Sequence, residues 1–174
     1  MIPDGELVRS RVLADVATLF EDALDRAHTG YAVLEPADAM LFEEEGSAVI
    51  TFESGVPVLA YHTRTERGGE SALADLAAPG PYQVALYDSA PGDLTAAHES
   101  DAFRVPPGAP AEKLAGAPQL ADRARRAAPE WVREEEEHAV EAFLADEEKI
   151  QAIREQARAE AQAKAEEWGF DDAV

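Results

Sequence analysis

Apolar residues at the start of the chain recur with the spacing of an amphipathic helix. Between residues 7 and 28 they stand three or four positions apart, which places them on one stripe, and charged residues occupy the other side. The stripe comprises Val8, Val12, Val16, Leu19, Phe20, Ala23, Leu24 and Ala27. Gly30 follows as a C-terminal stop. The pattern therefore predicts a helix over residues 7–28.

From Tyr31 the pattern changes to short apolar runs separated by turns. The runs that predict strands are residues 31–34, 40–42, 48–53, 56–63 and 82–87. Ser54-Gly55 separates two of these runs, which is a hairpin signal. Residues 70–77 predict a short helix that Pro79-Gly80-Pro81 ends. The fold class is α+β: a small antiparallel sheet with an N-terminal amphipathic helix and one short helix, over residues 1–90.

Two further regions follow this α+β domain. Residues 91–118 are rich in Pro, Gly and Ala, which predicts a linker or an ordered wrap. Residues 119–170 predict a helical tail, with a short helix over 119–127 and a long one after Pro129. Residues 130–168 contain no Gly or Pro, so they predict one long α-helix.

The long helix carries the candidate partner-binding residues. Most of its large apolar residues fall close to one seam, at steps of three, four or seven, as in a coiled coil. The candidates are Trp131, Val140, Phe143, Leu144, Ile150, Ile153 and Trp168. They predict binding of a protein partner or of a second copy of the chain through residues 130–168. The alternatives are a helix folded back onto its own domain and one that is helical from propensity alone.

Charge is the extreme feature of the composition. Thirty-six Asp and Glu against fifteen Lys and Arg give a formal net charge of −21, and only three of the cations are lysines. Such a charge pushes a compact domain apart in dilute buffer, whereas molar salt screens it within about 3 Å. This composition resembles the proteins of salt-in haloarchaea. The acidity then reflects the solvent and not a ligand.

The chain lacks the residue patterns that several classes of catalytic and metal-binding site need. The chain has no cysteine, and its four histidines share no metal-ligand spacing. The carboxylates of Glu134-Glu135-Glu136-Glu137 point around a helix at about 100° per residue, so they cannot converge on one ion. We therefore expect no catalytic, cofactor or metal site, and no enzymatic activity.

The same residues indicate where the protein acts. Residues 1–6 have no basic region and no apolar run, so we expect no signal peptide, and the apolar stretches are shorter than the roughly 20 residues of a membrane helix. The densest basic cluster is only Arg123, Arg125 and Arg126, so we expect no direct nucleic-acid binding. The expected location is the cytoplasm, without membrane contact.

A set of short motifs stands in order between residues 46 and 86. They are Phe52-Glu53-Ser54-Gly55, Ala60 at the end of a strand-like run, Gly69-Glu70-Ser71-Ala72-Leu73 and Gly80-Pro81-Tyr82. This succession resembles the PATAN (PatA N-terminal) type of domain. The resemblance implies a non-catalytic adaptor that works through protein–protein contacts in prokaryotic signalling or cell organisation.

The sequence thus favours an adaptor module, with two alternatives. The first is an acidic nucleic-acid mimic that occupies a basic groove, and the second is a small enzyme of unrecognised type. A mimic predicts acids gathered on one face. Here −10 lies in the last 46 residues (fifteen acids, five bases) and −11 in the first 128 (twenty-one acids, ten bases). Acids are spread throughout, which favours salt adaptation.

Thermal stability should depend steeply on salt. Between 0.1 M and 2 M KCl we expect the melting temperature to rise, because screening removes repulsion among the excess carboxylates. Calorimetry or circular dichroism melts would measure it. A melting temperature independent of salt would remove the halophile interpretation and make the acidity a functional feature.

Overall fold

The computed structural model describes most of the chain up to residue 134 and parts of the segment after it. The described residues are 5–37, 46–77, 81–90, 92–134, 137–138, 140–142, 144, 150–151 and 154–158. The chain forms two compact units, Met1–Val132 and Arg133–Val174.

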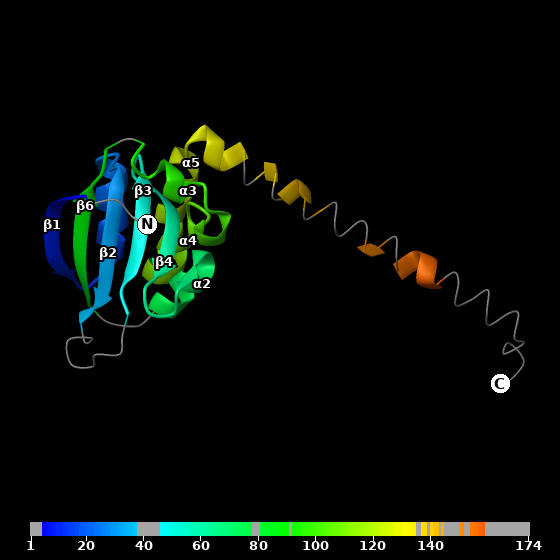
Figure 1. Cartoon of the computed structure of the whole chain (residues 1–174), viewed down its shortest axis with the longest axis horizontal. Coiled ribbons are helices and arrows are strands. Elements are labelled where there is room, and N and C mark those ends of the chain that lie inside the picture. Colours follow the sequence, from blue (N-terminus) through cyan, green and yellow to red (C-terminus); the bar gives the residue numbers. More distant parts are fainter. Residues whose placement is uncertain are drawn as a thin grey trace, which may run out of the picture. The chain divides into compact units, whose positions relative to one another are not determined.

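A six-stranded antiparallel sheet forms the framework of the first unit (Figure 1). Its strand order is β1-β6-β2-β3-β4-β5, so β1 lies at one edge and the two-residue β5 at the other. The strands are β1 Glu6–Leu13, β2 Gly30–Pro36, β3 Ala48–Glu53, β4 Val56–His62, β5 Arg67–Gly68 and β6 Tyr82–Asp88.

Helices connect and cover these strands. They are α1 Ala17–Asp25, α2 Gly69–Leu76, α3 Thr95–His98, α4 Ala109–Ala115 and α5 Pro118–Ala127, with a 3₁₀ helix η2 at Asp101–Phe103. Residues from α1, α2, α4 and α5 share one hydrophobic core with the sheet. The α3 and η2 segment instead lines the opposite face, beside β3 and β4.

The core follows from alternation along the strands. Successive side chains of a strand point to opposite faces, so every second residue meets the helices. Phe52 of β3 is fully buried, and its ring lies 6.2 Å from that of Phe20 in α1. The other buried strand residues of this face include Ala32, Leu34, Ala48, Ile50, Ala60, Tyr82, Val84 and Leu86. Phe52 therefore joins α1 to the centre of the sheet.

The prediction of one helix over residues 7–28 is wrong. Residues Glu6–Leu13 form the edge strand β1, and only Ala17–Asp25 is helical. The four-residue steps between Val8, Val12 and Val16 fit a helix, but they also fit a two-residue period because four is a multiple of two. Pairing with β6, far along the chain, decided the outcome, and local spacing does not record such long-range hydrogen bonds.

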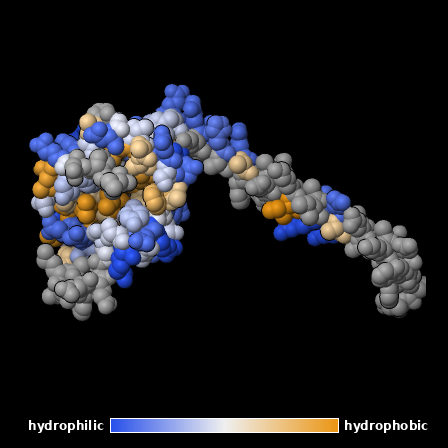
Figure 2. Space-filling view, in the orientation of Figure 1, coloured by the Kyte–Doolittle hydropathy of each residue, from blue (hydrophilic) through white to orange (hydrophobic). Residues whose placement is uncertain are grey.

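The edge strand is fixed to α1 by charge. Arg9 and Arg11 each place a guanidinium on Asp22, at 3.0 and 2.7 Å. Val12 on the other face is 58% exposed, and Figure 2 shows apolar surface along this edge of the unit. The predicted helix had instead placed Val8 and Val12 on its apolar stripe.

The remaining sheet predictions are confirmed where the structure describes them. The runs at 31–34, 48–53, 56–63 and 82–87 are β2, β3, β4 and β6, and the short helix at 70–77 is α2. The predicted hairpin is present, and its turn lies at Ser54 and Gly55. Both residues have positive φ (50° and 86°), as a two-residue turn needs in order to match the right-handed twist of its strands. A Cβ on Gly55 would stand 2.5 Å from the carbonyl oxygen of Ala23. The predicted strand at 40–42 lies outside the described residues.

Residues 92–132 are part of the first unit. Val105, Ala109, Ala111, Leu120 and Ala121 are buried in the same core as the sheet. The compact unit therefore extends to Val132, past the Pro-, Gly- and Ala-rich stretch at which the sequence pattern changes.

The described residues of the second unit are all helical. They support helical structure at intervals from residue 133 to residue 158. The single continuous helix over 130–168 includes residues outside the described set, so it stays a prediction.

Truncation of Phe52 tests the register of the core. Phe52→Ala should lower the free energy of unfolding by about 3–5 kcal/mol, because a fully buried ring is lost and its cavity cannot collapse. Val12→Ala, at an exposed position, should change it little. Denaturant unfolding in 2 M KCl measures both. A loss below about 1 kcal/mol for Phe52→Ala would indicate that the ring faces solvent and that the register of β3 is shifted by one residue.

Candidate interaction site

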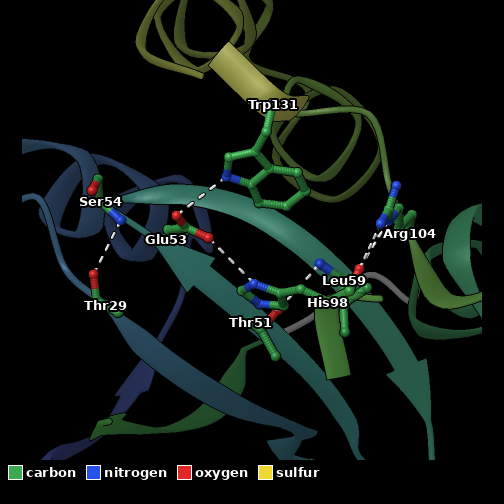
Figure 3. Close-up of polar contacts among 8 residues, drawn as sticks. All are labelled: Thr29, Thr51, Glu53, Ser54, Leu59, His98, Arg104 and Trp131. Atoms are coloured by element: carbon green, nitrogen blue, oxygen red, sulfur yellow. Dashed lines mark hydrogen bonds and ion pairs between the residues drawn. The ribbon is translucent and has the colours of Figure 1, made fainter. Parts of the chain in front are cut away.

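Among the described residues, Trp131 is the one predicted partner-binding residue that lies against the sheet of the first unit (Figure 3). Its indole Nε1 donates a hydrogen bond to Oε1 of Glu53 at 3.3 Å. The indole also stacks on the ring of His98, with centroids 6.1 Å apart and an interplanar angle of 27°. The guanidinium carbon of Arg104 lies 5.6 Å from the indole centroid, a cation–π geometry.

His98 is the buried centre of this group. It ends α3, and its ring nitrogens face opposite partners: Nδ1 lies 3.3 Å from Oε2 of Glu53, and Nε2 lies 3.1 Å from Oγ1 of Thr51. A neutral ring satisfies both contacts if Nδ1–H donates to the carboxylate and Nε2 accepts from the hydroxyl. Thr51 Oγ1 then still accepts from the backbone N–H of Leu59 at 3.2 Å.

The surroundings of this ring lower its pKa. Burial lowers the pKa of His98, the Glu53 carboxylate opposes that change, and the nearby Arg104 guanidinium adds to the lowering. Arg104 also fixes the end of α3, because its Nε and Nη2 donate to the carbonyl oxygen of His98 at 2.9 and 2.8 Å.

Glu53 joins α3 to the residues that follow α5, because each of its two carboxylate oxygens contacts a different segment. One oxygen accepts from Trp131 and the other faces His98, so β3, α3 and the residues after α5 meet at a single side chain. A small apolar cluster supports the same junction: Ala128 and Val132 pack with Val56 of β4. The chain is thereby held to the β3–β4 hairpin immediately before the second unit begins.

The other predicted site residues lie in the second unit. Val140, Leu144 and Ile150 are helical and remain 57, 52 and 49% exposed. Phe143, Ile153 and Trp168 lie outside the described residues. The structure thus places Trp131 in an anchoring cluster and three of its companions on an exposed helical surface.

Sequence reasoning missed His98, Glu53 and Arg104 as site residues. His98 and Arg104 come from the stretch that composition marks as a linker or wrap, and Glu53 is one of thirty-six acids. No spacing rule relates the three, because the fold brings them together over separations of up to 51 residues (53 to 104).

Two other histidines are also buried. His28 Nδ1 lies 3.0 Å from Asp88, and His62 Nδ1 lies 3.1 Å from the hydroxyl of Thr65. Burial lowers the pKa of both. Across the part of the chain that the structure describes, no group of three or more His, Asp or Glu side chains is placed to hold a metal ion. Within the same part, no helix has the length and apolar character needed to cross a membrane.

The buried histidines should make stability depend on pH. Their pKa is lowered in the folded chain, so below about pH 6.5 the unfolded chain binds more protons and unfolding is favoured. We expect the free energy of unfolding to fall between pH 7.5 and 5.5, and His98→Gln to reduce that slope. His138→Gln, at an exposed position, is the control. An unchanged slope in His98→Gln would show that His98 is not held neutral.

Comparison with known proteins adds a family. Neither the curated proteins nor the solved structures contain a match to the chain. Residues 1–170 match a family model described as a domain of unknown function, DUF8572. The match spans the sheet unit and most of the second unit together. The chain is therefore a member of the DUF8572 family.

Proposed function

We propose that the chain is a non-catalytic interaction module of a haloarchaeal cytoplasm, which binds a protein partner or a second copy of itself through a helix over residues 130–168. The observation that carries this proposal is the half-exposed trio Val140, Leu144 and Ile150. At about 100° per residue these positions fall within an arc of roughly 120°, the width of an apolar stripe that packs against another element.

Burial of this stripe is worth enough to drive a weak association. Each large aliphatic side chain that passes from water into a contact contributes roughly 1.5–3 kcal/mol when fully buried. The three side chains are only about half exposed, so together they support a modest affinity, which further residues of the seam would raise. Such contacts suit an adaptor, which must bind and release.

The anchoring cluster supports the same function. Trp131 and Val132 are held to the sheet by Glu53 and Val56. Residues that are already ordered cost no further conformational entropy when a partner binds. In this cluster Trp131 also has a structural role within the first unit.

The non-catalytic part of the proposal is supported by the hydrogen bonding of the His98 cluster. In the His98 cluster every ring nitrogen and carboxylate oxygen has a partner. A catalytic histidine needs one nitrogen directed to a reacting group. Here both nitrogens are engaged within the protein, which favours a structural role.

A triple substitution tests the helix. Val140→Ser, Leu144→Ser and Ile150→Ser together should abolish association and leave the first unit folded. The matched control is Glu134→Ser, His138→Ser and Glu141→Ser, at described helical positions on the opposite side. Light scattering after size exclusion in 2 M KCl measures mass, and hydrogen exchange measures the first unit. We expect a monomer from the triple variant and wild-type mass from the control.

Two outcomes would contradict the proposal. In the first, the wild-type chain is a monomer, and cross-linking captures the same partner proteins with the wild type and with the triple variant. The other is loss of association only when Leu7, Val8 and Val12, which are 53, 46 and 58% exposed, become Ser. That second result would move the interaction surface to β1.

A further inference from the structure

A cavity of about 480 Å³ lies on the face of the sheet opposite α1. Its floor consists of side chains from β3 and β4 that point away from the hydrophobic core, and its wall comes from α3, η2 and the residues between them. The lining residues are Val49, Thr51, Leu59, Tyr61, Thr63, Ala96, Ala97, Ser100 and Phe103. The cavity is partly open to solvent, and its size is that of sites that enclose small organic molecules.

Apolar groups dominate the lining. Val49 and Leu59 cover the floor, and the rings of Tyr61 and Phe103 meet edge to face with centroids 5.4 Å apart. Two alanines of α3, Ala96 and Ala97, leave the space that a longer side chain would fill. An apolar lining that includes two aromatic rings suits an aromatic molecule, because such rings pack favourably against another ring.

Among the described residues, the lining carries no charged side chain. An ion that entered would lose its hydration without gaining a counter-ion, which is strongly unfavourable. The net charge of −21 adds a general repulsion of anions. An uncharged molecule meets neither obstacle.

Two of the four lining hydroxyls are available to a bound molecule. Thr51 is engaged by Leu59 and His98, and the hydroxyl of Thr63 donates to the carbonyl oxygen of Ser47 at 3.0 Å. The hydroxyls of Tyr61 and Ser100, in contrast, make no hydrogen bond with any other described residue. A few polar groups in an apolar cavity set the orientation of what binds there.

From these observations we propose that the cavity binds an uncharged, mainly apolar aromatic small molecule that hydrogen-bonds to Tyr61 and Ser100. The lining residues all belong to the first unit, whereas Val140, Leu144 and Ile150 belong to the second. The contact between His98, at the end of α3, and Thr51 of β3 joins the wall of the cavity to its floor. The protein would then combine a small-molecule site with a partner-binding helix.

A pair of matched probes tests the class of molecule. N-phenyl-1-naphthylamine is neutral and carries one N–H donor, and 1-anilinonaphthalene-8-sulfonate has the same rings with an added anionic group. In fluorescence titrations of the full chain in 2 M KCl, we expect saturable one-to-one binding of the neutral probe and at least tenfold weaker binding of the anionic one. High salt screens the overall charge, so the difference reports on the cavity itself.

Substitutions in the wall locate the binding. Ala97→Phe and, as a second variant, Ala96→Phe fill the cavity from α3 and should each weaken binding of the neutral probe at least tenfold. Ala127→Phe, at an exposed position on α5, is the matched control and should bind like the wild type. Tyr61→Phe and Ser100→Ala should each weaken binding about threefold, because each removes one hydrogen-bonding hydroxyl. Circular dichroism confirms that each variant is folded.

Three results would overturn the proposal. The first is no saturable binding of the neutral probe. The second is equal or tighter binding of the anionic probe. The third is wild-type affinity in folded Ala97→Phe or Ala96→Phe, which would place the probe elsewhere on the protein.

Discussion

Glu53 is the contact that joins α3 and the residues after α5 to the end of β3. One of its oxygens accepts from Trp131 and the other faces the buried His98, while the residue itself ends β3. Because its two oxygens have different partners, one charged side chain holds two segments that lie far apart in the sequence. If either partner were absent, a partly buried carboxylate would be left with one donor from the protein. Glu53 thus connects α3, which forms part of the cavity wall, to the end of the first unit.

Charge has two opposing effects in this molecule. Several described arginines face acids, as in Arg9 and Arg11 on Asp22 or Arg67 on Asp75 at 3.1 Å. Such partly exposed pairs contribute about 0–1 kcal/mol each, and salt weakens them. The acids outnumber the bases by twenty-one. We therefore expect salt to remove more repulsion among the excess carboxylates than it weakens attraction within these pairs.

Elements whose pattern is local could be predicted, and those that depend on distant pairing could not. β3, β4 and their two-residue turn follow from β-branched runs around Ser54-Gly55. β1 could not be separated from a helix, because Val8 and Val12 fit both periods and only β6 distinguishes them. Trp131 could be singled out as a large apolar residue, but its bond to Glu53 spans 78 residues. Cavities on the second face of a sheet leave no periodic signal at all.

The last residues of the first unit are joined to the interior of the sheet and not to one of its edges. Trp131 donates to Glu53, which ends β3, and Val132 packs with Val56 of β4. β3 is paired on both sides, with β2 and with β4. Local opening of either edge strand, β1 or β5, therefore does not itself break these contacts or the pairing of β3.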